Sequence, residues 1–600
     1  MFNRKTIVVI SAMLFFTAAG TLARGLEEDW NDFLHYIKIG RLDLAAGYAR
    51  AVLESNPEPR ELLALSQKNP QGYRVLLKVY ESTSNTELAE LAGGILDVIE
   101  QGRFIRRAEP AIIAEEVRRL TSTARGRLTA VKRLQDAGEY AIPYMLDAMA
   151  DDSRKDELPN IIWALPHIGK DAIRPLAAAL QTDNIAVKAE IIIALGKIGY
   201  PQSLAYLKYI IEKDSSAQLR DLAAEAIREI DPAALNLEAA KLFYRLAENY
   251  YYHAQSLAPA HDADFCNMWF WDSAAQPLTL QRQEVDKGYF YELMAMRACE
   301  WALRADPGFG TAIGLWQAAF FKAESAGVEN MPDYFGPDHA NAAVYATTAG
   351  AEYLHQALAR AVKDKNAYVA LGVVEALATT AGEKSLLYRI GTAQPLVEAL
   401  TFNDRAVRYS AAIAIGAAGP KAEFAESKFV AQNLAEAVRQ TPDAAGNSAG
   451  IWNDKLANDY AVRAAEVMLK LAETQNSVID LSTAQDALIE ATKSNLPEIQ
   501  ILAGRVLAYL KTTGAQRCIA AMALDAGNDM DVRIAAFDSL AISAKFNASL
   551  LDSATVDAIY SIVASRDVEP ELRSAAAAAF GALNLPSEKV KDLILDQARS

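Results

Sequence analysis

Five residues of the types that bind metal ions lie close together in the middle of the sequence. They are His253, His261, Asp262, Asp264 and Cys266. A zinc site needs such groups to converge tetrahedrally, and its ligands usually come in close pairs such as CxxC, HxxxH or HExxH. None of these pairs occurs in the chain. The residue types alone are weak evidence, so we predict no metal site and no other cofactor.

One pentapeptide, Gly446-Asn447-Ser448-Ala449-Gly450, has the G-x-S-x-G pattern of a serine nucleophile. That pattern works when a strand delivers the serine to a strained turn before a helix. Here Thr-Pro-Asp and a segment without periodicity surround it, which indicates a loop. A phosphate-binding loop of the G-x-x-x-x-G-K-[ST] type is also missing from the sequence. We therefore predict no catalytic residue and no enzymatic activity.

A Lys or Arg recurs at the same place in five similar segments: Lys188, Arg220, Arg408, Arg533 and Arg573. These bases either line an anion-binding groove or pair with acids in neighbouring turns, such as Asp183, Asp404 and Asp531. The net charge of −16 favours intramolecular pairing. It also argues against nucleic acid as a partner, because phosphate backbones attract basic surfaces.

The run ADFCNMWFWD, residues 263–272, concentrates aromatic side chains in a chain rich in Ala, Leu and Ile. Trp269, Phe270 and Trp271 are candidate partner-binding residues, because aromatic anchors are typical of binding hot spots. Aromatic rings also fill gaps between packed helices, and an exposed patch of this size favours aggregation. We favour a buried plug. At least one of the two tryptophans should be buried against helices expected at 236–257 and 285–304, and at most one exposed.

These residues must be positioned by helices, because apolar residues recur at helical spacing. In the segment from Leu219 the stripe consists of Leu219, Ala223, Ala226, Ile227 and Ile230. Steps of 4, 3, 1 and 3 residues place these side chains on one face of an α-helix. The same skeleton begins at Val187, Val407, Val532 and Leu572. Strand-like alternation is absent after the N-terminal segment, so we expect no β-strand.

Glycines punctuate the repeat. Gly138, Gly169 and Gly199 follow three such stripes, and Gly is the usual residue at helix C-termini. A second helix, with Pro143 or Pro175 near its start, is predicted upstream of the later stripes. The unit is helix-turn-helix, about 30–40 residues long, which is the size class of helical solenoid repeats.

These segments resemble HEAT repeats, particularly the short bacterial kind also found in phycobilisome lyases. The resemblance covers roughly 115–235 and 345–600, and it implies a right-handed all-α solenoid of HEAT/ARM-like repeats. Some HEAT-repeat enzymes hold iron through His-Glu dipeptides, but Glu follows none of the six histidines here. A central segment is similar to a tetratricopeptide (TPR) unit, with Ala295, Cys299, Ala302 and Pro307 at that family's small, bulky, small and proline positions.

The predicted organisation is sequential. It comprises a signal peptide (1–23), an N-terminal helical region (24–114) with a TPR-like pair near 30–57, HEAT repeats (115–235), a TPR-like module with the aromatic insertion (236–342), HEAT repeats (343–440), a loop (441–455) and C-terminal HEAT-like repeats (456–600).

The N-terminus has the three parts of a secretory signal. Arg4 and Lys5 precede an apolar stretch, and Thr21-Leu22-Ala23 resembles a cleavage site. We expect a periplasmic or secreted protein, and an uncleaved N-terminal anchor is the alternative. The three cysteines make no disulfide framework, although an oxidising compartment would permit one bridge between Cys266 and Cys299.

Repeat arrays suit binding, because each repeat contacts mainly its neighbours and leaves a long face free. The sequence therefore predicts a bacterial, non-enzymatic scaffold that binds a protein partner. Two alternatives stay open at this point: an enzyme or enzyme subunit with an unrecognised, lyase-like site, and a structural component of the cell envelope.

Overall fold

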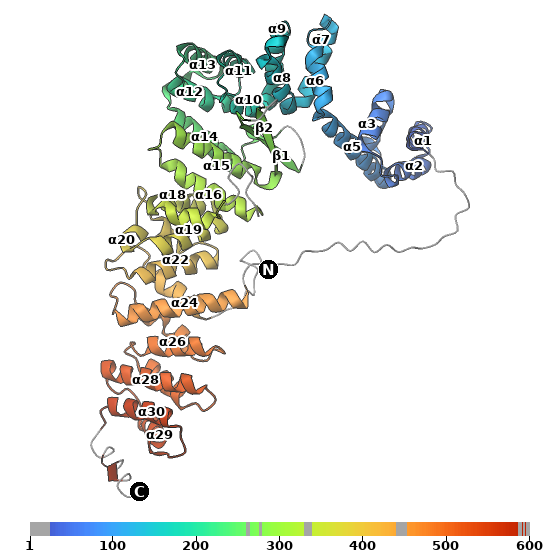
Figure 1. The fold of residues 1–600 in the computed structure, drawn as a ribbon. Helices are drawn as coiled ribbons and strands as arrows, with labels where there is room; N and C mark the ends of the chain where they lie inside the picture. The colour runs from blue at the N-terminus through green and yellow to red at the C-terminus, as the bar shows by residue number, and fades with distance from the viewer. Residues whose placement is uncertain are drawn as a thin grey trace. The chain divides into compact units, whose positions relative to one another are not determined.

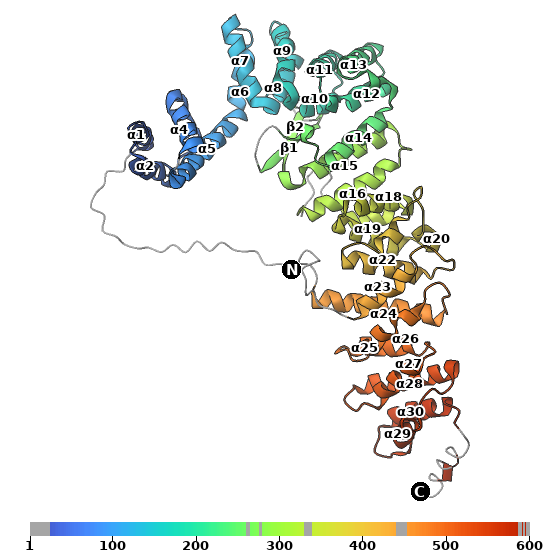
Figure 2. The same cartoon turned by 180° about the vertical axis from the view of Figure 1, so that it is seen from behind.

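The apolar stripes form helices whose buried faces match the sequence pattern. In the computed structural model Leu219, Ala223, Ala226 and Ile227 are buried, and Ile230 is half-buried. The model describes residues 25–83, 85–259, 264–274, 279–328, 339–439 and 453–585, together with 591, 594 and 595. The described part is almost entirely helical, which confirms the predicted all-α solenoid (Figures 1 and 2). The predicted signal peptide and the Gly446–Gly450 pentapeptide lie outside these residues.

The chain divides into two units. Unit 1 comprises residues 1–200 and 269–281, and unit 2 comprises residues 201–268 and 282–600. The division after residue 200 falls inside the predicted HEAT block 115–235. Each unit is described by itself below.

Unit 1 is built from short helices joined by tight turns. Its helices are α1 (Leu26–Lys38), α2 (Leu42–Glu54), α3 (Pro59–Lys68), α4 (Pro70–Ser82), α5 (Thr86–Arg107), α6 (Pro110–Arg119), α7 (Ala124–Ala137), α8 (Ala141–Ala150), α9 (Leu158–Ala164), α10 (Ile173–Ala179) and α11 (Ile185–Ile198). Three short 3-10 segments, η1 (Gly138–Tyr140), η2 (Asp152–Arg154) and η3 (Leu165–Ala172), lie between α7 and α10.

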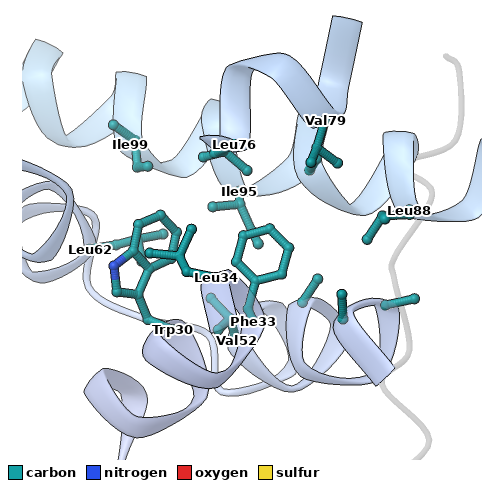
Figure 3. Packing of buried hydrophobic residues seen from close by; sticks show 14 of the residues in the cluster. Trp30, Phe33, Leu34, Val52, Leu62, Leu76, Val79, Leu88, Ile95 and Ile99 are labelled. Atoms are coloured by element: carbon teal, nitrogen blue, oxygen red, sulfur yellow. The ribbon is translucent and has the colours of Figure 1, made fainter. Parts of the chain in front are cut away.

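The N-terminal helices of unit 1 share one apolar core. Trp30 and Phe33 of α1 lie opposite Leu76 of α4 and Ile95 of α5, and all four are buried (Figure 3). Helices α1 and α2 pack against each other where the TPR-like pair is predicted. Buried side chains from all five helices α1 to α5 form this core, which explains why the N-terminal region folds as a single packed group.

Unit 2 continues the same construction. Its helices are α12 (Leu204–Lys213), α13 (Ala217–Ile230), α14 (Ala239–Tyr251), α15 (Lys287–Ala305), α16 (Thr311–Ser325), α17 (Ala342–Ala349), α18 (Ala351–Asp364), α19 (Ala367–Thr380), α20 (Glu383–Leu386), α21 (Pro395–Ala399), α22 (Arg405–Ala418), α23 (Lys428–Val438), α24 (Asp454–Glu473), α25 (Gln485–Ala491), α26 (Pro497–Leu507), α27 (Thr513–Leu524), α28 (Met530–Asn547), α29 (Ser553–Ala564) and α30 (Pro570–Ala582). From α14 to α30 each helix packs against a helix one or two places along the chain, such as α15 against α14 and α30 against α28 (Figures 1 and 2).

The glycines end helices as predicted. Gly138, Gly169 and Gly199 have φ angles of 59°, 79° and 73°. This left-handed region costs glycine nothing but crowds the side chain of any other residue. The repeat boundaries read from the sequence are therefore backbone requirements.

We call the five recurring bases, Lys188, Arg220, Arg408, Arg533 and Arg573, the ladder of bases. The recorded bonds of this ladder are intramolecular, but most of the acceptors differ from those predicted. Arg220 donates to the carbonyl oxygens of Asp214 and Ser215, at 2.8 and 2.9 Å, where α12 has just ended. Arg533 and Arg573 likewise donate to carbonyls at the end of the preceding helix. The last carbonyls of a helix lack partners within it, so they attract these guanidinium groups.

The aspartates proposed as ladder partners have a different role where the structure records one. Asp404 accepts hydrogen bonds from the backbone N–H groups of Ala406 and Val407, and so caps the start of α22. Arg408 donates to the carbonyls of Phe402 and Asn403, both at 3.1 Å. An acidic partner also appears on this base, but it is Glu436 of the next helix, at 3.1 Å.

The expectation of no β-strand is wrong. Residues Phe265–Trp271 form strand β1 and Leu280–Asp286 form strand β2, and the two pair as a small sheet. The backbone N–H of Asp272 donates to Thr279 and that of Lys287 to Asp264, so the strands run antiparallel as a hairpin. The aromatic run is thus an extended strand inserted between α14 and α15.

Candidate functional site

Strand β1 is covered on both faces. Cys266, Asn267, Met268 and Trp269 are consecutive and all buried. Neighbouring residues of a strand point to opposite faces, so burial of four in a row requires cover on each side. Alternation of polar and apolar residues is absent for the same reason, because a strand buried on both faces reads as a continuous apolar run.

Trp269 is anchored to a charged pair. Its indole N–H donates to Oε2 of Glu139 at 2.8 Å, and Arg174 contacts the same oxygen at 3.1 Å. The side chains of Glu139 and Arg174 are only 9% and 12% exposed. A buried indole needs an acceptor for its N–H, and this carboxylate supplies it.

Of the three aromatic residues proposed to bind a partner, the structure buries one. Trp269 is 3% exposed, while Phe270 and Trp271 are half-buried. The predicted limit of one exposed tryptophan is met, although the recorded hydrogen bond of Trp269 goes to Glu139 and not to the helices flanking the insertion. Trp269 is therefore unavailable to a partner, and partner binding by Phe270 and Trp271 stays a prediction.

Cys266 and Cys299 are both buried free cysteines, so the conceivable bridge between them is not formed. Burial raises the pKa of the Cys299 thiol well above its ordinary value, because a thiolate would be desolvated there. The thiol of Cys299 is accordingly an unreactive part of the core.

The described members of the metal-type group, His253, Asp264 and Cys266, form no metal site with other described residues. In the described residues no three His, Cys, Asp or Glu side chains are placed to hold an ion. His261 and Asp262 lie outside the described residues. His253 instead contacts Oε1 of Glu292 through Nε2 at 2.6 Å, and Lys322 contacts the same oxygen at 3.0 Å.

Glu292 is the acid at the centre of this cluster with His253 and Lys322, and only 2% of its side chain is exposed. Burial by itself raises the pKa of Glu292, but the hydrogen bond from His253 and the charge of Lys322 outweigh it, and the pKa lies below its ordinary value. Lys322 also donates to the carbonyl of Tyr251 at 2.7 Å. The cluster thereby connects α14, α15 and α16.

A second cluster connects α18 to α14. Arg360 donates to the hydroxyls of Tyr252 and Tyr244, at 2.8 and 2.9 Å, and to Glu248 at 2.8 Å. The recorded bonds of both clusters join helices of unit 2 to one another or to the two residues that directly follow α14. Their chemistry is accounted for by helix packing, and we assign no reaction to them.

Large apolar side chains on three alternate helices of unit 1 face solvent. Leu128 of α7, Trp163 of α9 and Ile185 of α11 are 64%, 41% and 56% exposed. The ring of Trp163 packs on that of His167, with centroids 4.6 Å apart. Gln135 of α7 donates to the carbonyl of His167 at 2.6 Å and holds α7 beside the segment that follows α9.

The offsets to the glycines indicate that these three residues share one face of the repeat. Leu128, Trp163 and Ile185 lie ten, six and fourteen residues before the glycine that ends their respective repeats. The offsets differ by multiples of four, and residues four apart lie above one another on a helix. We call Leu128, Trp163 and Ile185 the exposed row. Aligning the repeats on their glycines would have revealed it in the sequence.

The HEAT-repeat family model matches residues 142–228. No curated protein matches the chain. Among solved structures, the chain is similar to importin beta crystallised in ammonium sulfate (14% identity, 96% of this chain, 66% of that chain, TM-score 0.27) and to a chain in a Kap95p–RanGDP structure (14% identity, 87% and 69%, TM-score 0.27).

A third similar structure is the karyopherin Kap121p bound to the extreme C-terminus of the phosphatase Cdc14p (13% identity, 92% of this chain, 60% of that chain, TM-score 0.23). Within the described residues, no helix has the length and apolar character that a membrane span requires. The match at 142–228 includes Trp163 and Ile185 of the exposed row. Residues 142–228 are HEAT repeats, and the chain is an all-α solenoid.

Proposed function

We propose that this protein is a non-enzymatic scaffold that binds a protein partner through the exposed row. The observation that carries the proposal is the exposure of Leu128, Trp163 and Ile185 on three alternate helices, α7, α9 and α11. Tryptophan is strongly enriched among residues that dominate binding energy, and a surface that leaves it in water gains most from being covered.

The polar groups of unit 2 support a scaffold more than an enzyme. The buried acid Glu292 and the half-buried base Arg360 make their recorded bonds to other helices of unit 2 and to the residues that directly follow α14. Catalytic groups, in contrast, must reach a bound substrate. When the internal charges of a solenoid bond its own helices together, its outer faces remain free for recognition.

We also propose that the protein works outside the cytoplasm of a bacterium. The support is the N-terminal pattern of Arg4 and Lys5, an apolar stretch and Thr21-Leu22-Ala23. Mass spectrometry of protein from the native host is expected to find a chain that starts near Arg24. An intact Met1 in the folded pool would favour the N-terminal anchor instead.

Affinity capture with matched variants tests the scaffold proposal. The wild-type chain, Trp163→Ala and the control Phe546→Ala are used as bait against the native envelope fraction. Phe546 is 55% exposed but belongs to unit 2. We expect a defined set of proteins that Phe546→Ala retains and Trp163→Ala loses by about tenfold or more. Equal capture by all three baits would contradict binding through the exposed row.

A further inference from the structure

The region that begins the exposed row is basic, whereas the chain is acidic. Helices α6 and α7 and the turn between them, residues 110–137, contain six basic and three acidic residues, although the whole chain carries −16. The basic residues are Arg118, Arg119, Arg125, Arg127, Lys132 and Arg133. We call the surface of residues 110–137 the basic face.

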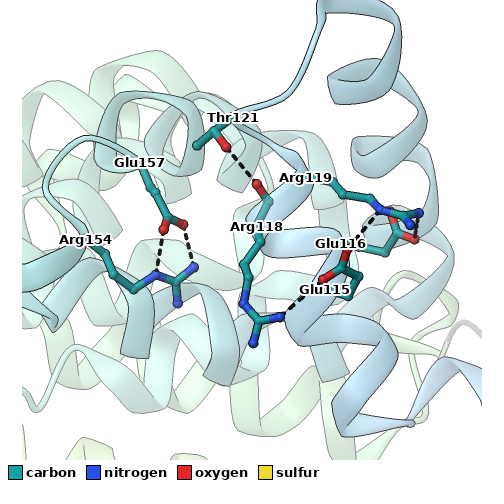
Figure 4. Close-up of polar contacts among 7 residues, drawn as sticks. All are labelled: Glu115, Glu116, Arg118, Arg119, Thr121, Arg154 and Glu157. Atoms are coloured by element: carbon teal, nitrogen blue, oxygen red, sulfur yellow. Dashed lines mark hydrogen bonds and ion pairs between the residues drawn. The ribbon is translucent and has the colours of Figure 1, made fainter.

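Two carboxylates neutralise only part of this charge. Glu115 contacts Arg118 and Arg119, both at 3.2 Å (Figure 4). Glu116 contacts Arg119 at 3.1 Å and Arg133 at 2.5 Å. Three guanidinium groups therefore share two carboxylates, and the arginine side chains remain 45% to 63% exposed. A surplus of positive charge stays in contact with solvent.

Three further cations on α7 have no ion-pair partner in the part of the chain that the structure describes: Arg125, Arg127 and Lys132. Arg125 and Lys132 are exposed. Arg125 and Arg127 lie at the start of α7, where no acidic residue occupies the first turn. The positive end of the helix dipole disfavours cations there. Charged residues that oppose a local preference, with no side-chain bond recorded among the described residues, are expected at sites of function.

An exposed leucine lies among these charges. Leu128 follows Arg125 by three residues and precedes Lys132 by four, so the three side chains lie along one face of α7. Leu128 also begins the exposed row that Trp163 continues on α9. The surface therefore combines positive charge with apolar contact area.

We infer that the basic face binds an acidic segment of a protein partner, with an apolar side chain of that segment seated on Leu128. This inference rests on the proposed scaffold function and names the chemistry of the partner. Complementary charge speeds encounter and selects the partner, and the apolar contact adds affinity. A nucleic acid fits less well, because its phosphate backbone offers no apolar side chain to seat on Leu128.

A peptide-binding measurement with the full chain tests the inference. The probe is a fluorescein-labelled peptide of about sixteen residues in which pairs of glutamates alternate with single leucines. Fluorescence anisotropy is expected to report binding that weakens as salt is raised. We expect Arg125→Glu/Lys132→Glu to weaken binding about tenfold or more, and Leu128→Ser about threefold or more.

The control variant Lys455→Glu/Arg505→Glu makes the same change in net charge at exposed residues of α24 and α26. It should bind within about twofold of wild type. Circular dichroism melting checks that each variant folds, and Arg125→Gln/Lys132→Gln repeats the test with a milder change. Equal weakening in the control, absence of peptide binding, or tighter binding of a single-stranded DNA oligomer would each overturn the inference. Capture of a native partner that depends on Trp163 but not on Arg125 or Lys132 would overturn it while leaving the scaffold function intact.

Discussion

Trp163 and Trp269 belong to the same unit, yet one ring lies at the surface and the other in the core. Trp163 is 41% exposed on a short HEAT helix, and Trp269 is 3% exposed in strand β1. The indole N–H of Trp269 has an acceptor, Glu139, which Arg174 also contacts. A large amphipathic ring is therefore buried where the chain itself supplies a partner for its polar atom.

The exposure of these side chains also decides which residues are candidates for a binding site. A dense aromatic run such as residues 263–272 attracts notice first, but the structure covers most of β1 on both faces. A single tryptophan among small and aliphatic residues is less conspicuous, and it is the one that meets solvent. The exposed fraction of a side chain, and not the number of aromatic residues near it, distinguishes a ring that fills the core, such as Trp269, from one at the surface, such as Trp163.

The largest effect is expected from removing the buried ring. Trp269→Ala should lower the free energy of unfolding by about 3–5 kcal/mol, because it leaves a cavity and removes a donor from Glu139. Trp163→Ala should change it by no more than about 0.5 kcal/mol, since that ring is already in contact with water. Urea unfolding followed by circular dichroism measures both. Similar losses in the two variants would refute the contrast.

The next effect concerns the core beneath the exposed row. Leu195 is fully buried in α11, the helix that presents Ile185 to solvent. Leu195→Ala should cost about 2–5 kcal/mol through lost burial and the cavity left behind. Ile185→Ala on the same helix is the matched control and should be close to neutral. A melting curve for Leu195→Ala that matches this control would mean that the predicted helix face is wrong.

Glu292 is a buried charged group whose bonding partners, like that of Trp269, come from the chain itself. Its folded pKa lies below the ordinary value, so its carboxylate stabilises the fold at and above pH 5, and this stabilisation is lost as pH falls through and below about 4. Glu292→Gln should cost about 2–3 kcal/mol at pH 7, less than a fully buried pair, because His253 and Lys322 are partly exposed.

A pH series checks this prediction for Glu292. Between pH 6 and 3 the variant Glu292→Gln should lose less stability than the wild type. The exposed Glu398 of α21 offers a control, and Glu398→Gln should follow the wild-type profile. Parallel profiles for all three proteins would show that Glu292 has the same pKa in the folded and unfolded chain.

The smallest effect is expected at the ladder of bases. Arg220→Met removes two hydrogen bonds to carbonyls that water can partly replace, so the expected loss is about 1 kcal/mol. Arg228→Met on the same helix is the control, because Arg228 is exposed. Differential scanning calorimetry should give a lower midpoint for Arg220→Met alone. A lower midpoint for both variants would point to the helix and not to the carbonyl bonds.

The helical architecture could be predicted because local spacing determines it. Helix periodicity explains the stripe from Leu219 to Ile230, and backbone sterics explain the glycine at 199. Both patterns are visible within a few residues of sequence. The ladder was predicted to be intramolecular, but its acceptors were missed. Backbone carbonyls carry no signature in a sequence, whereas acidic side chains such as Asp404 do.

The hairpin and the exposed row could not be read from local patterns. Strand β1 lacks alternation because cover on both faces, including Glu139 more than a hundred residues away, makes its residues uniformly buried. The exposed row combines single residues from three helices, so it emerges only when the repeats are aligned. Both features combine residues that lie far apart in the sequence.

Site-specific photocrosslinking tests the central claim, that the exposed row is the partner-binding surface. A benzophenone amino acid is placed at Trp163 or at Trp271 in the full chain, and cells that naturally produce the protein are irradiated. Our account predicts discrete adducts with one or a few proteins from position 163, and none of these adducts from position 271. Adducts that form from 271 and not from 163 would contradict it and would make the aromatic hairpin the binding site.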